Sequence, residues 1–259
     1  VVRQIERQPP VGIEIDYVPQ ESTLGIAHCV GCLESAIEGP FLLFLGDIYF
    51  HAPKLEGIIT VFRESKADAV LGAIEEEDTS AISRNYCIVT DEHGLARQVI
   101  EKPRFPKSRL KGVGIYLFTP VVFDAIRRTS RTAMRDEYEI TNSIQILIDD
   151  GFPVYPADVI EWDMNITFAC DLLECNRSQL GRLGKTQLVG EHAVLHPGVK
   201  LHGSVLGDRV VVDQPVEIKD SLVLPGTHIS GTQPIEGMVL TPELSIDCKS
   251  AQKEPDHAL

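Results

Sequence analysis

The sequence lacks a long apolar run and an excess of basic residues. Its longest run, Pro40 to Leu45, is far shorter than the ~20 residues that a membrane-spanning helix needs. Lys and Arg number 24 against 38 Asp and Glu, giving a formal net charge of −14. A nucleic-acid binder normally carries a basic face, whereas a nucleotide needs only a few local donors and cations. We therefore expect neither a membrane nor a nucleic acid as a partner.

The sequence also lacks a disulfide framework and a signal peptide. Its six cysteines are widely spread over 259 residues. Cys29 and Cys32 form a C-x-x-C pair, but no second pair follows at zinc spacing. This favours thiols that are at least partly buried on a helix over a metal or redox site. The residues before Pro9 alternate between apolar and charged, unlike a signal peptide. We expect a reducing, cytoplasmic compartment.

Strand and helix patterns alternate along the first two thirds of the chain. Ile13, Ile15 and Tyr17 alternate with acidic residues, which predicts a half-buried strand. The run over 41–45 is typical of a parallel strand covered on both faces. The other patterns are a helix over 25–37, a helix over 55–62, a strand over 69–74, a hairpin over 86–100, a strand over 113–118, and helices over 119–126 and 140–148. This order predicts a layered α/β domain with a mainly parallel sheet.

A period of six residues replaces these patterns after about Gly184. It relates two triplets of apolar residues, namely Val189, Leu195, Leu201 and Val212, Ile218, Leu224. This period fits a β-solenoid, in which each hexad forms one flat side of a coil. Ordinary hairpins with chance spacing are the alternative. We expect an α/β domain over 1–183, a solenoid over 184–246 and a loose polar tail over 247–259.

Three short motifs in the α/β region could carry chemistry. Asp47 follows a buried strand, where a carboxylate can hold Mg²⁺ bound to a phosphate. Glu101 and Lys102 follow another strand and could accept sugar hydroxyls and hold a phosphate. Gln20 could pair with a pyrimidine edge, and Gly25 would let the backbone approach a ring. Taken alone, the Asp47 motif favours a simple turn and the Glu101-Lys102 motif a surface loop. Gln20 and Gly25 fit the packing of a helix start as well as they fit a base site.

The order of these pieces resembles the sugar-phosphate nucleotidylyltransferases. The segment from Tyr17 to His28 resembles their nucleotide-base segment. Four further motifs follow in the family's order: Leu45-Gly-Asp47, Glu101-Lys-Pro103, Gly112-Val-Gly-Ile-Tyr-Leu-Phe118 and Glu139-Ile-Thr141. The resemblance is strongest to long-form glucose-1-phosphate thymidylyltransferases, which add a hexapeptide-repeat module. It implies a Rossmann-like nucleotidyltransferase sheet with a short C-terminal left-handed β-helix.

The resemblance also implies an activity and a set of site residues. A sugar-1-phosphate would attack dTTP or UTP, forming a dTDP-glucose type of product and pyrophosphate with Mg²⁺ as cofactor. Asp47 and Lys102 would be catalytic, with Asp47 as a metal ligand. The nucleotide would be bound by Gln20 and Gly25. The sugar phosphate would be bound by Glu101, Lys102, Gly114 and Tyr86.

Several features depart from the family's pattern. The N-terminal strand and glycine-rich loop that grip the triphosphate are lacking, so the chain is expected to begin part-way through the domain. The sheet edge left by that strand would be apolar and exposed, favouring a homo-oligomer. Ile48 replaces the Asn of the family's Gly-Asp-Asn. The second metal carboxylate aligns with Asn165, and Asp163 could substitute for it if the strand shifts.

A further departure lies before the hairpin, where the family has an aromatic–glycine pair. Here that pair falls at Asn85-Tyr86 or at Tyr86-Cys87, so no glycine is present. Three functions remain open: an active nucleotidylyltransferase, a non-catalytic sugar-nucleotide-binding or regulatory homologue, and an acyltransferase that uses the solenoid. The last would need a catalytic His, and His192, His196 and His202 are expected to face solvent instead.

Overall fold

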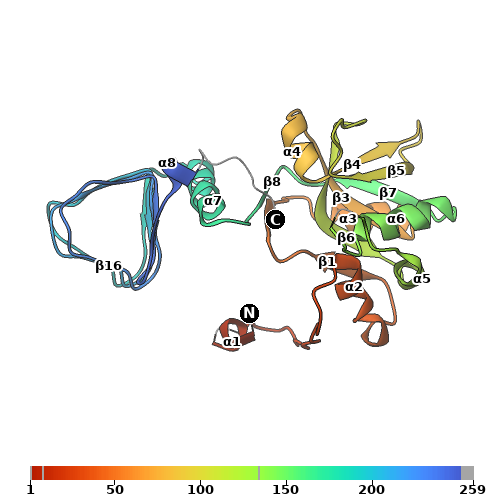
Figure 1. Ribbon diagram of the computed structural model, residues 1–259, viewed down its shortest axis with the longest axis horizontal. Helices are drawn as coiled ribbons and strands as arrows, with labels where there is room; N and C mark the ends of the chain where they lie inside the picture. Colours follow the sequence, from red (N-terminus) through yellow and green to blue (C-terminus); the bar gives the residue numbers. More distant parts are fainter. Residues whose placement is uncertain (1, 8, 134, 252–259) are drawn as a thin grey trace. The chain divides into compact units, whose positions relative to one another are not determined.

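A computed structural model describes residues 2–7, 9–133 and 135–251, and the chain forms two compact units (Figure 1). The first unit comprises Val1–Gly46 and Phe50–Trp162, and the second comprises Asp47–Tyr49 and Asp163–Leu259. Two short strands, β2 (Ile48–His51) and β8 (Trp162–Asn165), pair with each other. The chain passes from one unit to the other after Gly46, after Tyr49 and after Trp162.

A six-stranded sheet forms the centre of the first unit. Its order is β5-β4-β6-β3-β7, and β1 pairs with β6. The strands are β1 (Phe41–Phe44), β3 (Ala69–Glu75), β4 (Tyr86–Thr90), β5 (Ala96–Glu101), β6 (Leu110–Phe118) and β7 (Val154–Asp158). The α/β fold is as expected, but the expectation of a mainly parallel sheet is wrong. Because β6 inserts antiparallel between β1 and β3, the pair β3–β7 is the parallel one among the described strands of this sheet.

Helices pack on this sheet and bury both of its faces. Val70 and Leu71 are consecutive on β3 and both fully buried, so side chains pointing in opposite directions are covered. Residues of α2, α5 and α6 share a core cluster with Leu71, Tyr116 and Phe118. The helices are α2 (Ile26–Gly31), α3 (Gly57–Ser65), α4 (Thr79–Arg84), α5 (Val122–Arg128) and α6 (Ile140–Asp149); α1 (Val2–Arg7) precedes them. The sheet is a rigid support for the loops at its strand ends.

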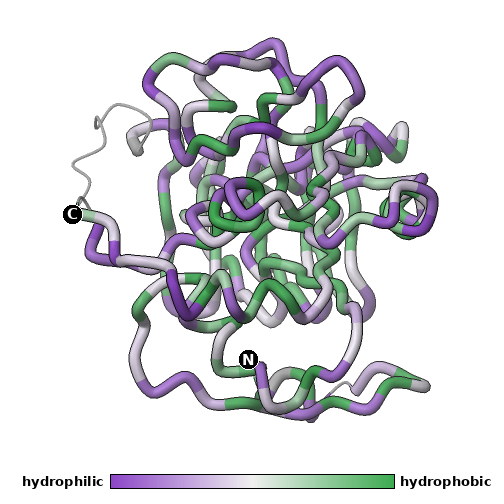
Figure 2. The backbone as a smooth tube through the Cα atoms, turned by 90° about the vertical axis from the view of Figure 1, so that its right-hand side faces the viewer, coloured by the Kyte–Doolittle hydropathy of each residue, from purple (hydrophilic) through white to green (hydrophobic). Residues whose placement is uncertain are grey.

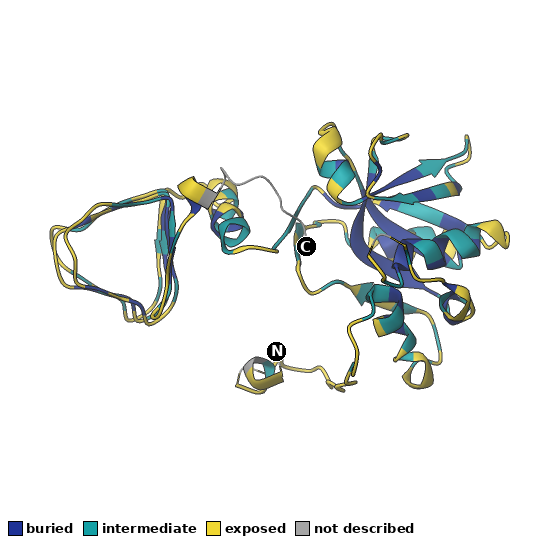
Figure 3. Cartoon of the chain, viewed as in Figure 1, coloured by how far each residue is buried: buried dark blue, intermediate teal, exposed yellow. Residues whose placement is uncertain are grey.

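The segment before α2 differs from the sequence prediction. Residues 13–17 form no strand, and Ile13 is 66% exposed (Figure 3). Strand formation needs a neighbouring strand, and none of the described strands pairs with this segment. Strand β1 is also less covered than its apolar sequence predicted, since Leu42 and Phe44 are exposed. The helix expected over 25–37 ends at Gly31 and is followed by a 3₁₀ turn, Glu34–Ala36.

The second unit contains helix α7 (Ala169–Arg182) and a parallel β-solenoid, consistent with a left-handed β-helix. The solenoid has three flat sides, with strand orders β10-β13-β16, β11-β14-β17 and β19-β18-β15-β12-β9 (Figure 1). Its strands are β9 (Gln187–Val189), β10 (Val194–Leu195), β11 (Lys200–His202), β12 (Ser204–Leu206), β13 (Val211–Val212), β14 (Glu217–Lys219), β15 (Leu222–Val223), β16 (His228–Ile229), β17 (Ile235–Glu236), β18 (Met238–Leu240) and β19 (Ser245–Asp247). The six-residue period thus predicted the correct architecture.

The coils repeat every 17 residues, since Leu188 pairs with Val205 and Val205 with Leu222. Three strict hexads would take 18 residues, so one side of each coil is one residue shorter. On this side of the coil, strand β15 therefore points Val223 inward, and not the expected Leu224. Val223 is fully buried in the solenoid core. Three of the expected histidines, His192, His196 and His202, are exposed.

The expectation of a loose tail from Asp247 onward is wrong for residues 247–251, which end the last strand and form a short helix. Asp247 ends β19, and residues 248–251 form α8 (Cys248–Ala251); residues 252–259 lie outside the described residues. Hydrophilic and apolar residues are interleaved along the backbone (Figure 2). Among the described residues, every helix is too short or too polar to cross a membrane.

Candidate active site

Lys102 lies at the turn that follows β5 and has an unusual backbone conformation. Its φ is 41°, in the left-handed region that favours glycine. The turn is fixed by the Lys102 backbone N–H, which donates to the carbonyl oxygen of Asn85 at 2.7 Å. The side chain is exposed. Five other described non-glycine residues share a left-handed φ, so this conformation marks a tight turn and the proposed role of Lys102 rests on its neighbours.

Glu101, immediately before it, is held among buried polar groups. The Thr141 hydroxyl donates to Glu101 Oε2 at 3.1 Å. Glu139 is only 5% exposed, and its Oε1 lies 3.7 Å from a guanidinium nitrogen of Arg135. Burial raises the pKa of Glu101, and the nearby Glu139 carboxylate raises it further. Burial likewise raises the pKa of Glu139, opposed by Arg135. Two acceptors of this kind suit a ligand that brings hydroxyl donors.

The raised pKa of Glu101 predicts a pH-dependent stability. The folded state holds this proton more tightly than the unfolded state, so the free energy of unfolding falls as the pH rises from the unfolded value near 4.5 through the folded pKa. Glu101→Gln removes the buried charge. We expect the variant to match the native protein below pH 4.5 and to be more stable above the folded pKa, measured by urea unfolding across this range.

Glu64→Gln is the matched control, because Glu64 is an exposed carboxylate of α3 in the same unit. It should follow the native protein at every pH. A Glu101→Gln variant whose stability difference from the native protein stayed constant across the pH range would contradict the buried-charge interpretation.

Tyr86 lies on the adjacent strand β4 and forms one wall of this site. It lies opposite Glu101 in the β4–β5 pair and opposite Gly112 in the β4–β6 pair. A Cβ atom on Gly112 would lie 1.9 Å from Tyr86 Cζ, so the ring occupies the space above the glycine. The ring also stacks on Tyr116, with centroids 6.3 Å apart. Tyr86 is 4% exposed and is therefore chiefly a wall of the site.

Gly114 lies where β6 departs from regular pairing. Tyr116 is opposite Leu71 and Gly112 is opposite Ala73, so β6 has extra residues at this point. Such bulges are frequent next to active sites because they redirect the chain. The Gly114 carbonyl accepts a 2.9 Å hydrogen bond from the Leu45 backbone N–H. That bond ties the bulge to the end of β1.

Gln20 and Gly25 lie at the entrance to α2. The Gln20 side-chain nitrogen is 3.1 Å from His28 Nδ1. Gly25 has φ 106°, and a Cβ there would lie 2.6 Å from the Tyr138 carbonyl oxygen. The Tyr138 backbone bonds with Leu24 and Ala27 on either side of this glycine. Gly25 thus lets two loops pack closely, and its contact with a base remains a prediction.

Asp47, Asp163 and Asn165 belong to the second unit. Asp47 is exposed, whereas the two β8 residues are half-buried. The Asp47 carbonyl oxygen accepts a 2.7 Å hydrogen bond from the Ile166 backbone N–H. The segment that contains Asp47 therefore lies beside the end of β8, which contains Asp163 and Asn165. No group of three or more His, Cys, Asp or Glu side chains within the described ranges is arranged to hold a metal ion.

The structure therefore brings the predicted sugar-phosphate residues together in the first unit and the predicted metal residues together in the second. Sequence reasoning missed Glu139, Thr141 and Arg135 as members of the site. The signal was present in the motif Glu139-Ile-Thr141, whose two polar side chains precede an apolar helix. Only the packing of α6 beside β5 shows that they meet Glu101.

The chain thus combines an α/β sheet, which has a half-buried carboxylate and a lysine at one strand end, with a β-solenoid. The nucleotidyl transferase family model matches residues 1–163. This match covers more than half of the chain, which therefore belongs to the nucleotidyl transferase family.

Several curated proteins are similar to this chain. A UTP–glucose-1-phosphate uridylyltransferase of Haloferax volcanii is 36% identical over 160 residues, covering 62% of this chain and 65% of the relative. A low-salt glycan biosynthesis nucleotidyltransferase of the same organism is 31% identical, covering 81% and 54%. A glucose-1-phosphate thymidylyltransferase of Streptomyces antibioticus is 28% identical, covering 87% and 65%. The chain thus spans less than two thirds of the length of these relatives.

A solved structure shares the fold. It is a UDP-glucose pyrophosphorylase complexed with UDP-glucose, with a TM-score of 0.56 and 19% identity, covering 64% of this chain and 66% of that chain. At this identity the likeness concerns the fold alone.

Proposed function

We propose that this chain transfers a nucleotidyl group from dTTP or UTP to glucose-1-phosphate, forming a nucleoside diphosphate glucose and pyrophosphate. The observation that carries the proposal is the hydrogen bond between half-buried Glu101 and buried Thr141, beside Lys102 with its left-handed backbone. The relatives support both nucleotides, since one is a uridylyltransferase and another a thymidylyltransferase.

The residues have distinct parts in this reaction. The Lys102 ammonium holds the phosphate of the sugar as a point charge, and Glu101 accepts sugar hydroxyls. An oxygen of that phosphate attacks the α-phosphorus of the triphosphate. The new P–O bond forms as the bond to pyrophosphate breaks, and pyrophosphate leaves with the electron pair. Positioning and charge neutralisation supply most of the catalysis in such transfers.

The residues around Asp47 fit a magnesium ion that enters with the triphosphate. Mg²⁺ is usually held by one or two carboxylates together with substrate phosphates and water. Here Asp47 offers an exposed carboxylate and Asn165 a weaker amide oxygen, which suits an ion bound mainly by the substrate. When bound, it would neutralise charge on the phosphates. Asp163 is the alternative carboxylate.

The test compares the native chain with Asp47→Asn in pyrophosphate release from dTTP or UTP with glucose-1-phosphate and Mg²⁺. We expect a loss on the order of 10²-fold in rate, because charge neutralisation at the phosphates is weakened. Asp158→Asn is the matched control, since Asp158 is an exposed carboxylate at the end of β7, and it should retain full activity.

Binding of UDP-glucose and dTDP-glucose is measured in parallel by calorimetry. Binding without turnover in the native chain would favour the non-catalytic homologue, in agreement with Asn165 and Ile48 at positions where the resembled family has Asp and Asn. Neither binding nor turnover in a folded chain would overturn the proposed function altogether.

A further inference from the structure

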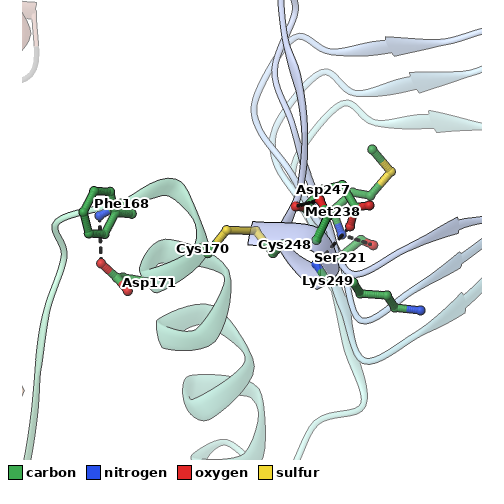
Figure 4. Close-up of a disulfide and its surroundings, with 9 residues drawn as sticks. Phe168, Cys170, Asp171, Ser221, Met238, Asp247, Cys248 and Lys249 are labelled. Carbon is green, nitrogen blue, oxygen red and sulfur yellow. Dashed lines mark hydrogen bonds between the residues drawn. A yellow bond between two sulfur atoms is a disulfide. The ribbon is translucent and has the colours of Figure 1, made fainter. Parts of the chain in front are cut away.

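Cys170 and Cys248 form a disulfide between helix α7 and the start of α8 (Figure 4). Their Cα atoms are 5.4 Å apart, within the range of ordinary disulfides. The two residues are 78 positions apart, and every strand of the solenoid lies between them. The cross-link therefore closes the whole solenoid into one covalent ring.

The disulfide lies at the edge of an apolar cluster. Cys248 is 7% exposed and packs with Leu173 of α7 and with Leu222 and Val239 of the solenoid. Cys170 is half-buried at the border of the same cluster. Both cysteines therefore belong to the packing between α7 and the solenoid.

The segment that Cys248 anchors is the last strand of the solenoid, and it is weakly held by other means. Strand β19 has three residues, runs antiparallel to β18 and has no other strand neighbour among the described residues. The Cys248 backbone N–H donates to the Gly237 carbonyl at 2.9 Å, and Lys249 Nζ lies 2.6 Å from Glu236. Lys249 and Lys219 together lower the pKa of Glu236 to about 2. Short terminal strands of this kind open easily unless they are tied down.

A small cavity reaches the disulfide from solvent. Its volume is about 130 Å³, and both cysteines line it together with Arg177, Lys249 and Asp220. Cys170 is the more exposed residue of the two, so its sulfur is the expected point of attack for a small thiol in this cavity.

We propose that Cys170 and Cys248 are a redox modification site at which low-molecular-weight thiols exchange with the disulfide and thereby release or fix the last strand of the solenoid. A thiolate attacks Cys170 Sγ, the bond to Cys248 breaks, and Cys248 leaves as a thiolate that takes a proton from water. A second thiolate attacks the mixed disulfide and leaves Cys170 as a thiol after protonation. The protein gains two electrons and two protons, and two small thiols become one small disulfide; the reverse reaction uses that small disulfide as oxidant.

The first measurement counts thiols in the chain purified in air. The protein is denatured in the presence of iodoacetamide, which alkylates free thiols, and its mass is measured. The experiment is done with and without prior reduction by glutathione. We expect four modified cysteines before reduction, namely Cys29, Cys32, Cys87 and Cys175, and six afterwards. Six modified cysteines before reduction, or a peptide map with another pairing, would overturn the proposal.

The second measurement follows hydrogen exchange of the native chain in oxidised and reduced glutathione. On reduction, amides of residues 245–248 should exchange at least about tenfold faster. The reason is that the disulfide no longer restricts the opening of the strand. Cys248→Ser should exchange at the reduced rate in both buffers. Cys29→Ser, an exposed thiol of the other unit, is the matched control and should behave as the native chain. Equal exchange in both buffers would show that the disulfide does not fix the strand.

Discussion

The Lys102→Ala variant is expected to lose nucleotidyl transfer to glucose-1-phosphate by a factor on the order of 10²–10³ in kcat/KM. Its ammonium is one of two cations, with Arg135, that act on half-buried Glu101, and the proposed reaction places the sugar phosphate against it. Alanine has the same left-handed backbone penalty as lysine, so the substitution removes the charge without changing the strain at φ 41°. Steady-state pyrophosphate release, with calorimetry for glucose-1-phosphate binding, measures the effect.

The Lys102→Gly variant distinguishes a loss of phosphate binding from a loss of protein stability. Glycine adopts a positive φ without the steric cost, so this variant should be more stable than the native protein by about 1 kcal/mol while being as inactive as Lys102→Ala. Lys107→Ala, in the following loop, is the charge control; Lys107 Nζ donates to Gln98 at 3.1 Å and has no assigned part in the site. Full activity in Lys102→Ala, or an equal loss in Lys107→Ala, would refute the assignment.

The Gly112→Ala variant is expected to be destabilised by about 3 kcal/mol, at the upper end of overpacking effects. A Cβ at this position would lie 1.9 Å from Tyr86 Cζ and 2.1 Å from another ring carbon. The ring cannot move aside easily, because Tyr86 is buried and stacks on Tyr116. The same displacement would disturb the wall of the proposed sugar-phosphate site, so activity should fall as well. Urea unfolding followed by circular dichroism measures the stability.

A double-mutant cycle with Tyr86→Ala identifies the clash. With the ring removed, Gly112→Ala should cost less than about 0.5 kcal/mol, so the two substitutions are strongly non-additive. Gly39→Ala is the matched control, since nothing lies within 4 Å of its Cβ position and its backbone is not left-handed. Additive effects of Gly112→Ala and Tyr86→Ala would show that the ring is not the obstacle.

The sequence by itself determined the elements whose patterns are local. The apolar run of β3, the hairpin β4–β5 and the helix α6 all fall within a few residues of their expected positions. The six-residue period predicted the solenoid for the same reason, since each hexad repeats one side-chain direction. The order of the short motifs, together with their resemblance to a known family, indicated the family that the comparisons then showed.

Only the tertiary structure decided the features that depend on partners distant in the chain. The antiparallel insertion of β6, the meeting of Thr141 with Glu101 and the Cys170–Cys248 disulfide join residues far apart in sequence, and no local pattern encodes their contact. Residues 13–17 show the converse: their alternation satisfies a strand, but no described strand pairs with them, so they remain extended and exposed. Local sequence determines which conformations a segment favours, whereas pairing and burial depend on neighbours that only the folded chain supplies.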